Sequence, residues 1–265
     1  MKRLTITTIG MLSISAYAQP TYITQLNEND TWLKTSLGYT SAKSEYDIDT
    51  SGNSRTPSTK TKGLDVTIVK MSQASPSFTP GFAASLATID DDGTNVSVFE
   101  VAGIARMNLG SLPSAISLGY QGTSKSDYRD SIIIDLNIGS KSEKSDFFNE
   151  FNLSYQSFIE ANNVSGADTL SLLNTSSFNI NDKIDLVTHF GASFISDAEV
   201  HNVKAVSYGT EINFGLGLDV DIDPSNTIQL SLTRSISDNE EFFGISTTEV
   251  ENTDTTFNVS LLKRF

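Results

Sequence analysis

The last nine residues of the chain, 257–265, alternate apolar with mostly polar side chains and end on an aromatic residue. This period of two predicts a β-strand with Phe257, Val259, Leu261 and Phe265 on one face. A terminal strand with one fully apolar face needs a sheet to pair with and apolar material to cover it. In a transmembrane β-barrel, lipid covers that face, and the strand closes the barrel against the first strand.

The same segment resembles the C-terminal targeting strand of Gram-negative outer-membrane proteins, in which a final Phe and apolar residues at every second position are read by the assembly machinery. The resemblance implies that Phe257, Val259, Leu261 and Phe265 form an assembly signal. It also implies three partners: the barrel-assembly machinery during insertion, outer-membrane lipid and lipopolysaccharide. Lys263 departs from the pattern, which usually has an apolar residue there, and the glycine often found earlier in that strand is absent. At a periplasmic interface the long stem of Lys263 can reach water.

The N-terminal end has the features of an export signal. Residues 1–3 (Met-Lys-Arg) are basic, residues 4–15 are moderately apolar, and Ala16-Tyr17-Ala18 fits the small-x-small cleavage pattern. We therefore predict a signal peptide over residues 1–18 and one barrel domain over residues 19–265. The predicted localisation is the cell outer membrane, after export across the inner membrane.

Composition excludes several classes of protein. The chain after residue 18 holds no run of 18 apolar residues, so no helix is expected to span a membrane, yet 38% hydrophobic residues are ample for strands that are apolar on one face. The absence of cysteine excludes a disulfide scaffold and a thiolate metal site. The formal net charge of −14 becomes −16 without Lys2 and Arg3, so a basic nucleic-acid footprint is missing. No cofactor is expected.

Period-two alternation runs through the whole chain and predicts an all-β, up-and-down antiparallel transmembrane barrel of twelve strands, with ten or fourteen as alternatives. The clearest strand is 206–221, where Ile212, Phe214, Leu216 and Leu218 alternate with polar or small residues that include Asn213. The candidate strands lie near 31–42, 63–73, 81–89, 96–108, 115–124, 131–139, 147–160, 167–178, 183–196, 206–221, 227–237 and 255–265.

Turn chemistry gives the topology. Compact turns containing Pro, at 75–80, 110–113 and 223–226, each follow an even-numbered strand. If the chain starts in the periplasm, these are the periplasmic turns. The segments expected to face outward as loops are 43–62, 197–205 and 238–254, together with the tight turn Asp90-Asp91-Asp92-Gly93.

The alternation assigns eight acids, two bases and one histidine to the inward face. An excess of carboxylates favours cations in a passage, so the sequence predicts a passive, cation-preferring pore. The alternative is a structural barrel with a plugged interior, in which Lys34 and Arg106 bridge neighbouring acids. The inward set is Lys34, Asp65, Glu100, Arg106, Asp135, Glu150, Asp185, His189, Glu211, Asp219 and Asp221.

Two other classes of protein stay open as alternatives. One is a hydrolase active at the barrel rim, because Asp90, Asp92, Glu199 and His201 bear a loose likeness to the acidic pair and the acid-His pair of omptin-type outer-membrane proteases. The simpler interpretation is that Asp90 and Asp92 belong to a tight turn and that Glu199 and His201 belong to a solvated loop. We predict no enzyme activity and no catalytic residue. The other alternative is a secreted soluble β-sandwich.

The segment 238–254 is strongly acidic and lacks Lys and Arg. It could attract divalent cations where these bridge lipopolysaccharide phosphates, although it does not have EF-hand spacing and no specific metal ligand is assigned. Phe242 and Phe243 are unusual in an exposed loop, and we expect them to fold against a neighbour.

Overall fold

The computed structural model describes residues 31–50, 53–55, 58–72, 78–91, 94–109, 112–125, 129–141, 147–161, 163–243 and 246–265. The predicted signal peptide, 1–18, lies outside these residues. Within them, no helix has the length and apolar character needed to cross a bilayer.

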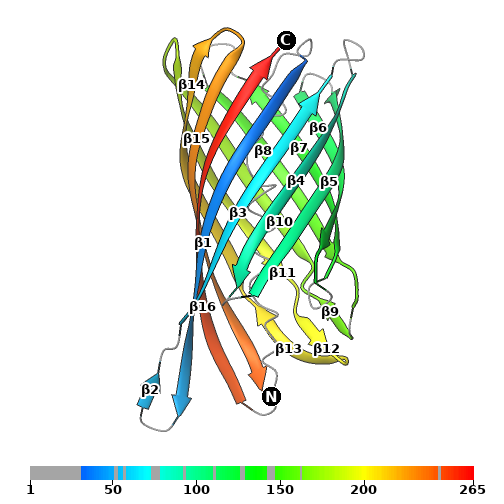
Figure 1. The fold of residues 1–265 in the computed structure, drawn as a ribbon, viewed down its shortest axis with the longest axis vertical. Helices are drawn as coiled ribbons and strands as arrows, with labels where there is room; N and C mark the ends of the chain where they lie inside the picture. Colours follow the sequence, from blue (N-terminus) through cyan, green and yellow to red (C-terminus); the bar gives the residue numbers. More distant parts are fainter. Residues whose placement is uncertain are drawn as a thin grey trace.

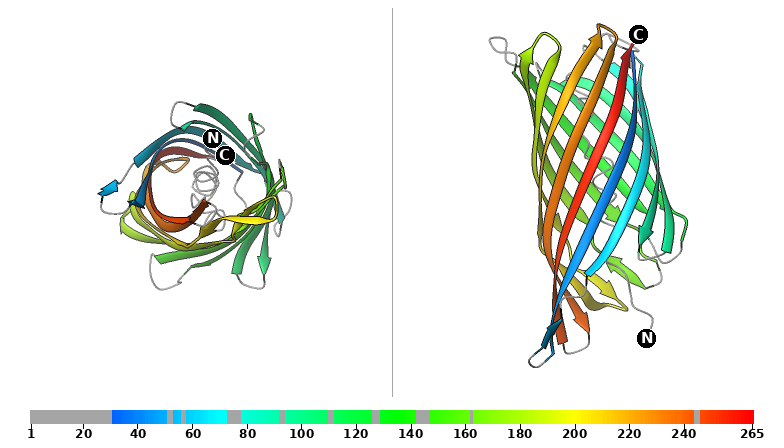
Figure 2. Two further views of the ribbon diagram at one scale, coloured as in Figure 1. Left: turned by 90° about the horizontal axis from the view of Figure 1, so that it is seen from below. Right: turned by 60° about the vertical axis from the view of Figure 1, so that its left-hand side comes forward.

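Twelve of the described strands form a closed antiparallel barrel (Figures 1 and 2), which confirms the predicted all-β, up-and-down fold. Each barrel strand pairs with the next one along the chain, and the last pairs with the first. The barrel strands are β1 (Trp32–Thr50), β3 (Ser58–Met71), β4 (Phe78–Asp91), β5 (Thr94–Leu109), β6 (Leu112–Thr123), β7 (Ser131–Lys141), β8 (Phe147–Phe158), β10 (Thr169–Asn181), β11 (Ile184–Ile195), β14 (Thr210–Asp223), β15 (Asn226–Phe243) and β16 (Ser246–Arg264).

The seam between the two ends of the chain closes the barrel. β1 and β16 pair without a shift in register, from Trp32 opposite Arg264 to Asp47 opposite Glu249. Inward hydroxyls reinforce the seam, since Ser260 Oγ donates to Ser36 Oγ at 2.9 Å. The last strand therefore closes against the first, as the terminal alternation predicts.

The two ends of the barrel differ. At the end that holds the C-terminus, which we name the short-turn end, the connections are tight, for example residues 182–183 between β10 and β11 and 224–225 between β14 and β15. At the opposite end, the hairpin end, the hairpins β1–β3 and β15–β16 project past the rest of the wall (Figure 1). Short turns at one end and long projections at the other are typical of outer-membrane barrels, with the short turns in the periplasm.

The predicted outward loops are wrong in detail, because the structure continues the strands through much of them. β1 runs on to Thr50 and β3 begins at Ser58, which leaves little of the loop 43–62. The segment 238–254 is a hairpin that pairs Asp238 with Glu251 and Glu240 with Glu249. These stretches are polar on both faces, so alternation gives no signal there, and the backbone ladder of the neighbouring strands extends them.

The segment 197–205 is also ordered. β12 (Ala198–Val200) and β13 (Val203–Tyr208) form a small hairpin that pairs on one side with β9 (Val164–Gly166) and on the other with β15, while β2 (Asn53–Arg55) pairs with β1. Two residues with positive φ, His201 (53°) and Asn202 (61°), make its turn, as in the primed turns preferred by tight hairpins. The side strip β9–β12–β13 thus extends the wall at the hairpin end.

The outer face of the barrel is a belt of exposed apolar side chains. Alternate residues on neighbouring strands are exposed, for example Leu64 (58%), Leu118 (61%) and Phe257 (47%), while most residues between them are buried. So large an exposed apolar surface would aggregate in water and is what lipid covers. Phe257, Val259, Leu261 and Phe265 all lie in this belt.

One part of the inward face is apolar, which the sequence does not predict. A cluster near the short-turn end joins side chains from six barrel strands, and Trp32 and Met71 are fully buried in it. This cluster fills one sector of the interior with packed apolar side chains. Its members are Trp32, Val69, Met71, Ala83, Ile104, Ala115 and Leu262.

Candidate functional site: the barrel interior and its acidic mouth

Every charged side chain predicted to face inward lies at an inward position of a described barrel strand. Seven of them are at most 5% exposed: Lys34, Glu100, Arg106, Asp135, Glu150, His189 and Glu211. Asp65, Asp185 and Asp219 are half-buried, and Asp221 is exposed close to the end of β14. The period of two places them, because each alternates with an apolar residue of the outer belt. Their role in selectivity stays a prediction.

Lys34 sits at the centre of a cluster that reaches across the interior. Its ammonium charge interacts with the carboxylates of Asp219 on β14 and Glu150 on β8. His189 on β11 feels the charge of Lys34 as well, and its Nδ1 lies 3.2 Å from the hydroxyl of Thr175. The ammonium group of Lys34, on β1, therefore interacts with charged or titratable side chains on three other strands, β8, β11 and β14.

Two further acids, Asp185 and Asp221, lie beside Asp219 of that cluster, at the short-turn end. Asp185 and Asp219 stand directly opposite each other on β11 and β14, and Asp219 interacts with the charges of both Asp185 and Asp221. Gln229 Nε2 donates to Asp219 Oδ2 at 2.9 Å. Asp221 lies 4.0 Å from Arg264 at the rim. The three carboxylates form a negatively charged group at this mouth.

A second acidic pair lines the middle of the barrel. Glu100 on β5 is only 1% exposed, and its charge interacts with that of Asp135 on β7. Ser117 Oγ donates to Asp135 Oδ2 at 2.7 Å, whereas Glu100 Oε1 is buried with no hydrogen-bond partner. Arg106, 4% exposed, lies on the same strand as Glu100, nearer the short-turn end.

The sequence misses two further inward acids. Asp254 on β16 is 7% exposed and Glu241 on β15 is 9% exposed, and both were expected in the outward loop 238–254. The charge of Asp254 interacts with that of Glu211 on β14. Continuing the alternation of β16 from Asn258 through Thr256 to position 254 would have revealed the inward position of Asp254.

Between the charges, the interior is lined by hydroxyl and amide side chains that bond across strands. Examples are Gln156 Nε2 to Gln121 Oε1 at 3.1 Å, Ser171 Oγ to Ser193 Oγ at 2.9 Å and Ser44 Oγ to Asn252 Oδ1 at 2.6 Å. These bonds satisfy buried polar groups and fix the inner wall. The inner wall is therefore hydrophilic over most of its extent and carries an excess of negative charge.

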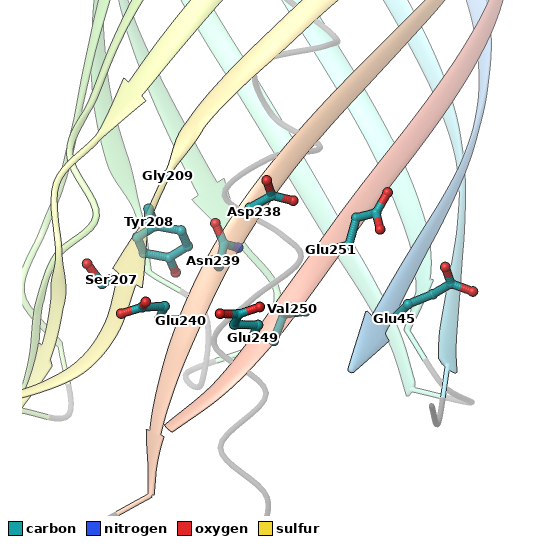
Figure 3. A pocket seen from close by; sticks show the side chains of 10 residues that line it. All are labelled: Glu45, Ser207, Tyr208, Gly209, Asp238, Asn239, Glu240, Glu249, Val250 and Glu251. Carbon is teal, nitrogen blue, oxygen red and sulfur yellow. The ribbon is translucent and has the colours of Figure 1, made fainter. Parts of the chain in front are cut away.

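The hairpin end carries an acidic cleft of about 840 Å³ on the β15–β16 hairpin (Figure 3). Its acids stand in register: Asp238 is opposite Glu251 and Glu251 is opposite Glu45, with Glu240 opposite Glu249 in the next outward row. Like charges directly opposite each other destabilise a sheet, so these rows favour the approach of cations. Ser207 and Tyr208 of β13, and Gly209, which follows β13, also line the cleft.

Phe242 contacts a neighbouring strand, as the sequence predicts for this side chain. The Nζ atom of Lys204 on β13 lies 5.4 Å from the centre of the Phe242 ring, in a cation–π contact that ties the hairpin to the side strip. Lys204 also pairs with Asp197 at 2.7 Å, and Ser207 Oγ donates to the same carboxylate at 2.8 Å. These contacts hold the pKa of Asp197 below its ordinary value.

The residues proposed for a rim-active hydrolase do not converge in the described part of the chain. Glu199 stands opposite Lys204 and Ser165 in the side strip, and His201 is an exposed turn residue whose backbone N–H donates to the carbonyl of Asn163 at 2.9 Å. Asp92 lies outside the described residues. Among the described residues, no group of three or more His, Asp and Glu side chains is arranged to hold a metal ion.

No protein-family model and no curated protein sequence matches this chain. Solved structures nevertheless share its fold. An outer-membrane channel from Pseudomonas putida F1 superposes with a TM-score of 0.70 over 93% of this chain and 99% of the channel, at 9% sequence identity. The translocator domain of the autotransporter NalP from Neisseria meningitidis gives a TM-score of 0.52 over 96% of this chain and 97% of its own, at 16% identity. The deltaS2 mutant of the TodX monoaromatic hydrocarbon channel gives 0.51 over 89% of this chain and 91% of its own, at 9% identity. At these identities the likeness establishes the fold alone, a closed antiparallel β-barrel like those of the outer-membrane proteins compared here.

Proposed function

We propose that this protein is a passive channel of the outer membrane whose interior prefers cations. The observation that carries the proposal is the sign of the inward charges in the described strands. In the described strands, the eight predicted acids, joined by Glu241 and Asp254, face three inward bases: Lys34, Arg106 and, at the short-turn rim, Arg264. Two of the three solved structures compared above are channels, which supports a pore over a catalyst.

The physical basis of the preference is the field of closely spaced carboxylates in a narrow passage. Walls of low dielectric focus that field, and charges inside the wall are screened less by salt than surface charges are. The acidic cleft at the hairpin end adds to the effect by raising the local concentration of cations at that mouth, including divalent cations. Lys34 acts in the opposite sense, because its ammonium sets a local barrier to cations between Asp219 and Glu150.

A structural role as a closed barrel is the second candidate, and a specific observation favours it. Most inward side chains are buried, and the apolar cluster around Trp32 and Met71 fills one sector near the short-turn end. A passage through such an interior is narrow. If the channel conducts, we expect it to carry small ions and to exclude bulky solutes.

Reversal potentials in a planar lipid bilayer under a KCl gradient test the proposal. The wild-type channel should be cation-selective, and the variant Asp185→Asn/Asp219→Asn/Asp221→Asn should have a lower permeability ratio of K⁺ to Cl⁻, more so at low salt. The matched control removes the same number of acids from the outward rows at the hairpin end, as Glu240→Gln/Glu249→Gln/Glu251→Gln, and should change selectivity less.

An anion-selective wild type, or an inner triple variant with unchanged selectivity, would overturn the acidic interior as the basis of selectivity. A folded protein that never conducts would instead identify a structural barrel.

A further inference from the structure

Four basic side chains form a band on the outer wall of the barrel, immediately past the apolar belt at the hairpin end. We name it the basic band: Lys43 on β1, Lys60 and Lys62 on β3, and Arg234 on β15. The side chains of Lys60, Lys62 and Arg234 are exposed, and that of Lys43 is 46% exposed. We propose that this band binds the phosphate groups of lipopolysaccharide in the outer leaflet. The proposal rests on the outer-membrane location given above.

Strand register defines the position of the band. The last apolar row of the belt runs across four neighbouring strands, with Leu232 opposite Phe257, Phe257 opposite Tyr39 and Tyr39 opposite Leu64. All four side chains are 42–58% exposed.

The basic residues occupy the next two outward rows. Two residues farther along each strand, the row reads Arg234, Thr255, Ser41 and Lys62. In the row after that, Lys43 stands directly opposite Lys60. On these four strands the two rows contain four bases and no acid, and one acid lies beside them, Asp90 of β4, opposite Lys62. Positive charge thus predominates at this depth.

Facing lysines need an anion between them. Like charges directly opposite each other in a sheet are destabilising, and Lys43 and Lys60 are such a pair. Glu45 relieves Lys43 through an ion pair, but in the described part of the chain Lys60 and Arg234 have no ion-pair partner. A phosphate that spans neighbouring strands about 4.8 Å apart can accept from more than one of these cations.

The depth of the band matches a lipid headgroup. On the outer face of β3, Leu64, Val66 and Ile68 separate Lys62 from the next outward charge, Lys70. The eight residues from Lys62 to Lys70 span about 26 Å of strand, or about 20 Å along the membrane normal at the usual tilt, close to the ~25 Å apolar band of such barrels. The two lysines therefore mark the two borders of the hydrocarbon layer.

The choice of lipopolysaccharide over phospholipid follows from the end of the barrel and from the next charged rows. The basic band lies toward the projecting hairpins, which face outward if the short turns are periplasmic. Beyond it come the acidic rows of the cleft, with Asp238, Glu251 and Glu45 in the first. Lipopolysaccharide has phosphates at the membrane surface, which complement the basic band. Farther out it has acidic groups with bound divalent cations, which complement the acidic rows.

Binding of lipopolysaccharide to the purified full-length protein in detergent micelles tests the proposal. The probes are intact lipopolysaccharide, the same lipid after enzymatic dephosphorylation, and phosphatidylglycerol. The test variant is Lys60→Gln/Lys62→Gln. The control is Lys70→Gln/Lys263→Gln, which removes two exposed lysines from the opposite border of the belt.

Lys60→Gln/Lys62→Gln should weaken binding of intact lipopolysaccharide about 30-fold, since each surface lysine contributes about a factor of five against an anionic headgroup. The control should bind nearly as wild type does, dephosphorylated lipopolysaccharide should bind wild type as weakly as it binds the test variant, and Lys60→Arg/Lys62→Arg should restore binding. Far-UV circular dichroism and heat-modifiable gel migration verify that each variant is folded.

Three results would overturn the proposal: equal losses in the test and control variants, full binding of the dephosphorylated lipid, or equal binding of phosphatidylglycerol. A loss confined to the control would show that the barrel has the opposite orientation, which also overturns it. These measurements do not depend on conductance. A negative result would therefore reject the lipopolysaccharide site without affecting the channel proposal, and a protein that does not conduct could still bind lipopolysaccharide.

Discussion

Arginine placed at two depths on one strand provides a direct test that lipid covers the outer wall. Leu216 and Ile222 both lie on the outward face of β14 and are 61% and 54% exposed. They differ in depth, because Ile222 is next to the last residue of the strand at the short-turn rim and Leu216 lies six residues earlier. Six residues span about 20 Å of strand, or about 15 Å along the membrane normal, which brings Leu216 near the bilayer centre.

The expected costs follow from these depths. An arginine near the midplane costs about 2–4 kcal/mol, whereas one near the interface costs about 0–1 kcal/mol. Leu216 stands between Thr188 and Leu232 on the neighbouring strands, so an arginine there has no acidic partner beside it in its row. Leu216→Arg should therefore destabilise the barrel by roughly 2 kcal/mol more than Ile222→Arg does.

Urea unfolding of protein folded into phospholipid vesicles, followed by far-UV circular dichroism, measures the difference. With a urea dependence of about 1–3 kcal/mol/M, the midpoint of Leu216→Arg should lie about 1 M below that of Ile222→Arg. Leu216→Ala controls for the lost leucine contacts and should lie near wild type. Equal midpoints for the two arginine variants would refute a lipid-covered wall, because on a water-exposed surface an arginine is tolerated at both positions.

Three further predictions concern the inner wall, assembly and the side strip. Gly191→Ala should destabilise the barrel by about 1–3 kcal/mol, because a β-carbon there would lie 2.6 Å from the backbone carbonyl oxygen of Leu172. Gly103→Ala meets nothing within 4 Å and should be neutral, and urea midpoints compare the two. Deleting Phe265 should reduce the amount of assembled protein in the outer membrane, measured by heat-modifiable gel migration, far more than its loss of packing would, and normal levels would exclude its role as an assembly signal. The lowered pKa of Asp197 means that its ion pair stabilises the β12–β13 hairpin fully above about pH 4. Protection factors for amide hydrogen exchange in that hairpin, corrected for the pH dependence of intrinsic exchange, should fall only as the pH falls through this lowered value, and Asp197→Asn should remove the dependence.

The sequence predicts the barrel well because lipid and interior impose opposite demands on alternate residues. Strand β14 is the clearest case, since Leu216 and Leu218 face out while Asp219 faces in. The hairpin around Glu240 and Glu249 is harder to predict, because no lipid covers its outer face. Acids there alternate with buried polar residues such as Asn239 and Glu241, so the sequence shows no alternation of apolar and polar residues.

The arrangement of the interior is harder to predict than its composition. The cluster of Lys34, Glu150 and Asp219 joins residues far apart in the sequence, and only closure of the barrel and the stagger of its strands bring them together. The apolar cluster around Trp32 is missed for a different reason: period two identifies two faces and assigns the polar one to the inside, yet a narrow barrel can pack apolar side chains there. Face assignment therefore predicts which charges point inward, but it does not predict which of them meet.

A tryptophan at the seam between β1 and β16 provides an intrinsic fluorescence signal for closure of the barrel. Trp32, the single tryptophan, stands opposite Arg264, and its fully buried environment includes Leu262, so it forms only when the two ends of the chain meet. Joining segments some 200 residues apart costs about 5 kcal/mol of chain entropy, which favours closure as a late step in folding. Tryptophan emission should then shift after far-UV circular dichroism has recorded strand formation. The delay between the two signals would time the passage from an inserted open sheet to a sealed cylinder, without any added label.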